Sequence, residues 1–384
     1  MKIAIPKERR PGETRVAASP DTVKKFTGFG FNVVVEKDAG LAADITDDLF
    51  KTAGATIAKD EASTLNDADI IFKIQRPIID DAAANELALM KKGAIVIGYM
   101  AALANKKDVE AYAKAGIVAF AMELMPRIAR AQSMDILSSQ SNLAGYKAVL
   151  DAAAEYGSAF PMMMTAAGTI APAKVFIMGV GVAGLQAIAT AKRMGAVVTA
   201  TDVRPATKEQ VASLGGKFLS VDPEMEKEAE TAGGYAKEMP PEYFEKQKAV
   251  VAEHIKKQNI VITTALIPGR PAPVLVTEEM VKTMAPGSVI IDLAVEMGGN
   301  CPLSQLGKVV VKHGVKIVGH ENVPGRLPKD ASTLYAKNLL NFLSPHIDGE
   351  SKSLKIDWED ETIKGTLLTR DGKVVNPMLT GKGN

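Results

Sequence analysis

Residues 126–140, PRIARAQSMDILSSQ, hold polar side chains of the kinds that bind small molecules. The segment carries Arg127, Gln132, Asp135 and Ser138 between two apolar stretches, and it contains no His, Cys or Lys. General acid–base catalysis most often uses a histidine or another group that titrates near neutral pH. The segment is therefore either a binding site that moves no proton or a hydrogen-bond network that supports the fold.

A second candidate site lies in residues 173–205, AKVFIMGVGVAGLQAIATAKRMGAVVTATDVRP. Gly179, Gly181 and Gly184 form G-x-G-x-x-G between an apolar strand pattern and a helical pattern. Such glycines allow a tight turn, close approach of the backbone to a pyrophosphate, and close packing of the helix on the strand. The amino end of the helix then faces the phosphates. This context predicts a dinucleotide-binding βαβ unit rather than a glycine-rich turn without a ligand.

The next strand pattern ends at Asp202, where a carboxylate can accept hydrogen bonds from an adenosine ribose. The same carboxylate repels a 2′-phosphate, so the sequence favours NAD over NADP. Arg204 keeps NADP as an alternative cofactor, because an arginine at this position can bind a 2′-phosphate.

Hydride transfer to a small substrate also needs an acid or a base. Only His320 follows a strand pattern where such sheets line their ligand crevice. The other histidines are expected at the surface or in structural roles: His254, His313 and His346. Lys73 and Arg76 are expected either to bind a substrate carboxylate or to be solvated, and Asp292 and Glu296 to be structural.

The elements that must position these residues alternate strand and helix patterns, which is typical of βαβ units and parallel sheets. Strands are predicted at 2–6, 31–36, 69–74, 94–100 and 117–123, a long helix at 141–157, and a second α/β run from residue 174. The Ala- and Met-rich stretch 159–191 is expected to be buried core, and 362–376 a hairpin that returns to the first domain.

The predicted fold class is α/β, with two Rossmann-like parallel-sheet domains and the nucleotide site in the cleft between them. The expected domains are residues 1–137 plus 327–384, and residues 138–326. An acidic, irregular segment, 222–243, interrupts the second domain and is expected to be a functional loop or a surface insertion.

The composition is that of an ordinary globular protein, with 384 residues of which 47% are hydrophobic and 24% charged. A net charge of +1 without a dense Lys/Arg run gives no basis for a nucleic-acid surface. A single cysteine, Cys301, excludes a disulfide framework, and no metal is expected. Neither a signal peptide nor a membrane span is expected.

Four segments together resemble the NAD(H)-binding component of proton-translocating nicotinamide nucleotide transhydrogenases, a family related to alanine dehydrogenases. They are PKERRPGETRVAASP, RAQSMDILSSQSNLAGYKAV, the glycine-rich segment and NVPGRLPKDAS. The resemblance implies direct hydride transfer between NADH and NADP(H) on a partner component, of the Si-specific/Re-specific type, coupled to proton translocation. Because this transfer moves no proton on the reacting atoms, binding, orientation and exclusion of water suffice.

An alanine dehydrogenase-like amino-acid dehydrogenase is the alternative, because Lys73 is retained. That family places a catalytic histidine after the strand that here reads AIVIGYM, where this chain has Tyr99 and Met100. A third possibility is a regulator that binds NADH and transfers no hydride.

The resemblance assigns catalytic roles on the nicotinamide side to Arg127, Gln132, Asp135 and Ser138, and to Tyr235 on a mobile loop at about 222–240. The full set of implied cofactor contacts is Arg127, Ile128, Ala129, Gln132, Ser133, Met134, Asp135, Gly179, Val180, Gly181, Val182, Gly184, Asp202, Val203, Arg204, Gly234, Gln247 and Leu266.

The resemblance further implies a homodimer that docks against an NADP(H)-binding component and a membrane-embedded component. The chain, which stops at NPMLTGKGN, looks like a separately made soluble subunit. It is therefore expected in the cytoplasm, held at the inner face of the bacterial cytoplasmic membrane through its partner subunits.

Overall fold

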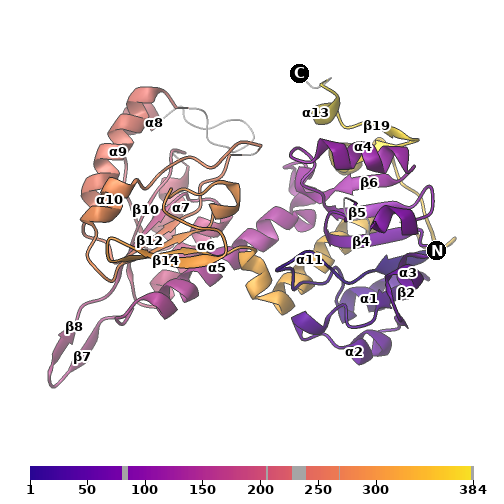
Figure 1. Cartoon of the computed structure of the whole chain (residues 1–384), viewed down its shortest axis with the longest axis horizontal. Coiled ribbons are helices and arrows are strands. Elements are labelled where there is room, and N and C mark those ends of the chain that lie inside the picture. The colour runs from indigo at the N-terminus through magenta and orange to yellow at the C-terminus, as the bar shows by residue number, and fades with distance from the viewer. Residues whose placement is uncertain (80–84, 205, 227–238, 268, 382–384) are drawn as a thin grey trace. The chain divides into compact units, whose positions relative to one another are not determined.

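A computed structural model describes residues 1–79, 85–204, 206–226, 239–267 and 269–381 (Figure 1). The chain forms two compact units, Met1–Gln140 with Gly325–Asn384, and Ser141–Pro324. The sequence placed these boundaries at 137/138 and 326/327. Both the predicted boundary at 137/138 and the observed one at 140/141 fall inside one continuous helix, α5 (Ile136–Glu155). This helix begins five residues before the predicted start at 141.

The first unit contains, in its described residues, an eight-stranded sheet in the order β19-β18-β6-β5-β4-β1-β2-β3. β1 to β6 pair in parallel, whereas β18 is antiparallel to both β6 and β19. The carboxyl-terminal hairpin therefore completes the sheet of the first unit, as predicted. The strands of this sheet are β1 (Lys2–Ile5), β2 (Asn32–Glu36), β3 (Thr56–Ala58), β4 (Ile70–Gln75), β5 (Ile95–Tyr99), β6 (Val118–Ala121), β18 (Leu367–Arg370) and β19 (Lys373–Val374).

Helices cover both faces of this sheet, because alternate residues of the parallel strands are buried on opposite sides. One face packs against α1 and α11, and the other against α4. The helices of the unit are α1 (Pro20–Gly28), α2 (Asp47–Thr52), α3 (Glu61–Leu65), α4 (Lys106–Lys114), α11 (Pro328–Leu343), α12 (Glu361–Thr366) and α13 (Pro377–Thr380). A small hairpin of β16 (Ile347–Asp348) and β17 (Ser353–Leu354) follows α11.

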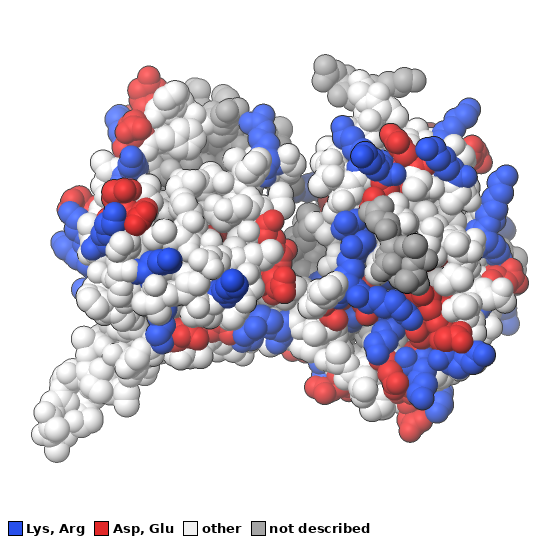
Figure 2. Space-filling view, viewed as in Figure 1, with Lys and Arg blue, Asp and Glu red and all other residues white. Residues whose placement is uncertain are grey.

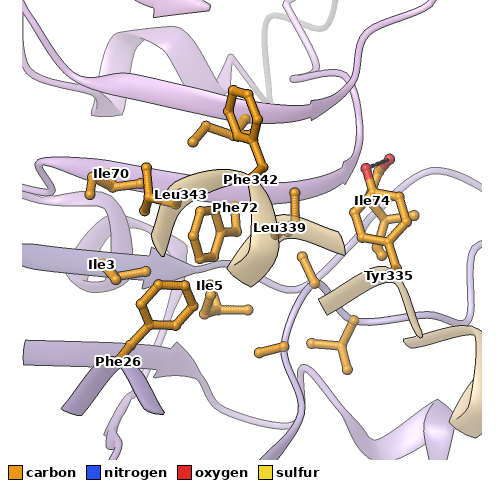
Figure 3. Close-up of a cluster of buried hydrophobic side chains, with 14 of the residues drawn as sticks. Ile3, Ile5, Phe26, Ile70, Phe72, Ile74, Tyr335, Leu339, Phe342 and Leu343 are labelled. Carbon is orange, nitrogen blue, oxygen red and sulfur yellow. Dashed lines mark hydrogen bonds between the residues drawn. The ribbon is translucent and has the colours of Figure 1, made fainter. Parts of the chain in front are cut away.

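Helix α11 ties the carboxyl-terminal part of the chain to the first sheet. Leu339 and Phe342 pack over the β1 and β4 side chains (Figure 3). The hydroxyl of Tyr335 accepts a hydrogen bond from the Tyr99 N–H (2.8 Å) and donates to the Lys73 carbonyl (3.0 Å). One buried hydroxyl thus satisfies backbone groups of β4 and β5 together.

The second unit contains a seven-stranded sheet in the order β11-β10-β9-β12-β13-β15-β14, parallel except for the edge strand β14 in the described chain. One face packs against α5, α6 and α7, and the other against α9 and α10. The strands are β9 (Lys174–Met178), β10 (Val197–Thr201), β11 (Lys217–Phe218), β12 (Ile260–Thr263), β13 (Val289–Asp292), β14 (Lys308–Lys312) and β15 (Val315–Gly319). The helices are α6 (Val182–Arg193), α7 (Thr207–Ser213), α8 (Pro223–Glu226), α9 (Pro241–Ile255) and α10 (Glu278–Thr283).

The expectation that 159–191 is buried core is wrong for its first portion. Residues 161–171 are exposed and form a hairpin, β7 (Met163–Thr165) and β8 (Gly168–Ile170), that extends from the second unit (Figure 1). Its apolar residues suggested burial, but they lie on a separate two-stranded sheet and are exposed. The sequence also missed the strands β3 and β14, and residues 86–89 form a 3₁₀ helix.

The Tyr335 hydroxyl gives a stability prediction for the first unit. Tyr335→Phe leaves the Tyr99 N–H and the Lys73 carbonyl without this partner, which costs about 1–3 kcal/mol of unfolding free energy. Urea unfolding can be followed by the fluorescence of Trp358, the chain's single tryptophan, which packs against the same core.

Tyr112→Phe is the matched control, because the buried Tyr112 hydroxyl has no hydrogen-bond partner in the described part of the chain. Its removal should leave the unfolding free energy nearly unchanged. Equal losses in the two variants would show that the Tyr335 hydrogen bonds contribute nothing.

Candidate nucleotide-binding site

The glycine-rich turn after β9 has the geometry that the fingerprint requires. Gly179 has a φ of +96°, which favours glycine, and its N–H donates to the Thr201 carbonyl (3.0 Å). A Cβ on Gly184 would lie 2.0 Å from the Gly179 carbonyl oxygen, so helix α6 approaches β9 as closely as glycine permits. A Cβ on Gly181 would meet nothing within 4 Å, so the backbone there faces open space on the side where a pyrophosphate would approach.

Helix α6 begins at this turn with Gly181 as its N-cap, and the cap makes no side-chain hydrogen bond. The first N–H groups of a helix have no partner within the helix, and they carry the positive end of its dipole. A phosphate group can accept hydrogen bonds from these N–H groups, and its negative charge is stabilised by the positive end of the dipole.

Asp202 follows β10, and its carboxylate joins the turn to Arg204. Its carboxylate accepts from the Val180 N–H (2.7 Å), from the Arg204 N–H (2.9 Å) and from two nitrogens of the Arg204 guanidinium (both 2.9 Å). The pairing has two consequences. Asp202 fixes the turn at Val180, and it offsets the positive charge of Arg204 that would otherwise attract a 2′-phosphate.

The loop after β12 contacts the same turn from the other side. The Thr264 hydroxyl donates to the Gly179 carbonyl (2.9 Å), and the Thr264 N–H donates to the Met178 carbonyl (2.9 Å). Because β10 and β12 flank β9 on opposite sides, Asp202 and the loop carrying Leu266 lie on opposite sides of the turn. Leu266 on this loop is 54% exposed.

The polar segment 126–140 lies in the first unit, where Ala129–Met134 form a 3₁₀ helix that leads into α5. The Asp135 carboxylate accepts from the Ser138 N–H (3.0 Å) and the Ser138 hydroxyl (2.5 Å), as a helix-capping side chain does. The side-chain amides of Asn338 and Asn341 on α11 both donate to the Ser133 carbonyl (2.9 and 3.0 Å).

This anchoring presents several residues of the segment to solvent. Arg127 and Gln132 are exposed, as are Ala129 and Ser133, while Ile128 is half-buried and Met134 is buried in the core. The sequence did not identify the capping role of Asp135 and Ser138, although an Asp three residues before a Ser at the start of a helix is a capping signal.

The acidic segment is only partly described. Gly234 and Tyr235 lie outside the described residues, and 223–226 and 241–243 are helical rather than irregular. The Glu226 carboxylate accepts from the Val221 N–H (2.8 Å) and the buried Tyr243 hydroxyl (3.3 Å), so the two flanks of the segment are joined. Gln247 lies half-buried on α9, and Val203 packs with Tyr243 in a small cluster.

Lys73 does not offer a free ammonium group to a substrate. It is 1% exposed, and its Nζ lies 2.7 Å from Glu86 and 3.2 Å from Glu8. Burial disfavours the charged lysine, but the two carboxylates outweigh it and raise the pKa of Lys73. Burial also raises the pKa of the Glu8 carboxyl to about 7, against the effect of Lys73. Arg76 is likewise paired, with Asp108 at 2.8 Å.

The remaining candidates have different surroundings. His320 follows β15 as predicted and is half-buried. His254 is half-buried: it packs on Phe176, and its ring lies 2.8 Å from the Thr199 hydroxyl. Burial lowers the pKa of His254, which favours its neutral form. Asp292 is buried and structural, as expected. The described residues contain no cluster that could hold a metal ion.

A dinucleotide fingerprint in a two-unit α/β chain defines a class of nucleotide-binding proteins, and comparisons with known proteins narrow the class. Residues 4–144 match the family model "Alanine dehydrogenase/PNT, N-terminal domain" and residues 148–377 match "Alanine dehydrogenase/PNT, C-terminal domain". The chain is 66% identical over its full length to all of a Rhodospirillum rubrum protein, which is named as the first portion of NAD(P) transhydrogenase subunit alpha.

A transhydrogenase crystal structure from Sinorhizobium meliloti matches with a TM-score of 0.88 and 54% identity, covering 98% of this chain and 100% of that one. Alanine dehydrogenase 1 of Staphylococcus aureus is 28% identical over 99% of this chain and 96% of its own length. The chain belongs to the NAD(P) transhydrogenase alpha-subunit family, within the wider alanine dehydrogenase/PNT group. None of the helices in the described ranges is long and apolar enough to cross a membrane.

The Asp202–Arg204 pair generates a specificity prediction. Asp202→Ala removes the acceptor for a ribose and for Val180, and it removes the carboxylate that pairs with the Arg204 guanidinium. The dissociation constant for NADH, measured by titration calorimetry, should rise about tenfold, equivalent to about 1.4 kcal/mol. The discrimination against NADPH should fall in the same titrations.

Asp202→Asn separates charge from hydrogen bonding, because it keeps an acceptor for the Val180 N–H. This variant should relax the discrimination against NADPH with a smaller loss of NADH affinity. Unchanged affinities for both nucleotides in both variants would remove Asp202 from the site.

Proposed function

We propose that this chain is the NAD(H)-binding subunit of a proton-translocating transhydrogenase. It binds NAD(H), and a hydride passes directly between NADH and NADP⁺ held on a partner component, coupled to proton translocation across the membrane. The reaction is of the Si-specific/Re-specific type, and the chain is active only with its partner subunits. The observation that carries the proposal is the fingerprint turn braced by Asp202, in a chain similar throughout to a protein named for transhydrogenation.

The nicotinamide supplies the hydride chemistry, so the residues of the chain have only to hold it. In the first unit, the exposed Arg127 and Gln132 offer hydrogen-bond groups suited to a carboxamide and a ribose. Asp135, Ser138 and the backbone of 128–134 complete the proposed nicotinamide contacts. In the second unit, the proposed contacts to the phosphates and adenosine lie in the turn and at the strand end: Gly179, Val180, Gly181, Val182, Gly184, Asp202, Val203 and Arg204. Gly234, Gln247 and Leu266 are proposed as further cofactor contacts, and Tyr235 is proposed to act at the bound nucleotide.

The burial of Lys73 argues against the alternative, an alanine dehydrogenase-like enzyme. A substrate carboxylate would have to displace Glu8 or Glu86 from a buried ammonium, and leaving a buried carboxylate unpaired is strongly unfavourable. The segment after β5 has Tyr99 and Met100, and Met100 is buried. These residues offer no imidazole to act as a base.

The proposed assembly is a homodimer that docks NADP(H)-binding and membrane-embedded components at the inner face of the bacterial cytoplasmic membrane. The β7–β8 hairpin supports the dimer. Residues 158–173 contain no Lys, Arg, Asp or Glu, and the hairpin is correspondingly white in Figure 2. Met164 is 78% exposed at this hairpin, and an exposed apolar arm of this kind is typical of an interface.

A mixing experiment tests the proposed reaction. This chain, an NADP(H)-binding component from a relative, NADH and an NADP analogue with a distinct absorbance band should together show hydride transfer, which neither protein gives alone. Reduction of pyruvate with ammonia and NADH by this chain alone would identify an amino-acid dehydrogenase. NADH binding without transfer to any partner would identify a regulator.

In the same assay, Gln132→Asn should slow hydride transfer at least tenfold while changing NADH affinity less than about threefold, because it shifts the nicotinamide and leaves the phosphate contacts in place. Gln210→Asn, the same change on the exposed side of α7, should alter neither quantity. Equal losses of rate and affinity in Gln132→Asn would mean that Gln132 does not orient the ring.

Met164→Glu tests the proposed dimer. A charge on the apolar hairpin should shift the protein from dimer to monomer in sedimentation velocity, because a buried unpaired carboxylate is unfavourable. Met378→Glu is the control, because Met378 is 60% exposed on α13 in the first unit. A Met164→Glu protein that sediments as the unchanged dimer would remove the hairpin from the interface.

A further inference from the structure

A buried side chain, Asn300, holds both ends of the loop after β12. Its Oδ1 accepts from the Ala265 N–H (3.1 Å), and its Nδ2 donates to the carbonyls of Ala265 (2.9 Å) and Pro273 (2.7 Å). The amide therefore pairs with both backbone groups of Ala265 and also joins the two ends of the loop. Asn300 is fully buried, so no water competes for these bonds.

Asn300 is in turn fixed by Asp292 at the end of β13. One Asp292 oxygen accepts from the Asn300 N–H (3.1 Å), and the other accepts from the Cys301 N–H (3.1 Å) and the Ser304 hydroxyl (2.6 Å). The chain turns tightly to allow this. Gly299 has a φ of +82°, and a Cβ there would lie 2.7 Å from the Asp292 carboxylate.

The loop that Asn300 fixes adjoins the fingerprint turn. Thr264, next to Ala265, donates its hydroxyl to the Gly179 carbonyl at 2.9 Å. The loop lies on the β12 side of β9, opposite Asp202 on the β10 side. A dinucleotide spans the two sides of such a turn, with its adenosine ribose at the carboxylate after the second strand. The nicotinamide half then lies towards Ala265 and Leu266.

We propose that Asn300 is a positioning residue for the nicotinamide half of the cofactor, acting through the Ala265–Leu266 backbone. The inference rests on the proposed function, because it requires NAD(H) at the fingerprint. Asparagine suits the task because it provides a donor and an acceptor on one planar group. An aspartate there would keep the acceptor for Ala265 N–H but would turn a negative oxygen towards two carbonyls.

Asn300→Asp and titrations with two nucleotides test this role. NADH should bind at least tenfold more weakly to the variant, while 5′-AMP, which reaches only the Asp202 side, should bind within twofold of the unaltered protein. A general loosening of the second unit would weaken both nucleotides together. The difference between NADH and 5′-AMP is therefore a readout that a merely structural role does not produce.

Asn259→Asp is the matched control, because Asn259 precedes the same strand, β12, at its opposite end, where its side chain accepts from the Lys174 N–H (2.9 Å). It should change neither affinity. If Asn300→Asp does not fold, Asn300→Ser provides the same comparison with an uncharged side chain too short to reach both carbonyls.

Unchanged NADH affinity, or equal losses for NADH and 5′-AMP, would overturn the role of Asn300 and leave the proposed function intact. An unaltered protein that binds neither nucleotide would instead overturn the proposed function. The two failures are therefore distinguishable in one set of titrations.

Discussion

The close approach of helix α6 to strand β9 is the constraint on which the second unit depends. It exists because residue 184 has no side chain, since any Cβ there would collide with the Gly179 carbonyl. This approach brings the amino end of α6 to the end of the central strand, with a neighbouring strand on either side. The turn between them forms a platform whose N–H groups can bind an anion.

The platform is braced from both sides by side chains that hydrogen-bond to its backbone. Asp202 bonds to Val180 on one side, and Thr264 bonds to Gly179 on the other. Asp292 and Asn300 extend this bracing to the next loop. The arrangement is consistent with a protein that orients a cofactor, because such sites need their supporting groups locked by further hydrogen bonds.

In the first unit, the sheet is completed by β18 and β19 from the carboxyl-terminal part of the chain. The exposed polar segment 126–140 is held beside this sheet. Helix α11 fastens the segment through Asn338 and Asn341, and it joins the sheet through Tyr335. In the same unit, the buried Lys73 lies between the carboxylates of Glu8 and Glu86. The ammonium of Lys73 is therefore paired within the protein and is not available to a substrate carboxylate.

Local patterns in the sequence determined the βαβ units, the fingerprint turn and the carboxyl-terminal hairpin, because glycine positions and strand periodicity act over a few residues. They also determined Asp202 as a strand-end carboxylate. Only the tertiary structure decided which charged groups are paired, because Lys73 and Glu86, or Asn300 and Ala265, meet through packing rather than spacing. The tertiary structure also decided that the hairpin at 163–170 is exposed to solvent. From the sequence, its apolar residues could belong either to a core or to a surface hairpin, and only the observed strand pairing distinguishes the two.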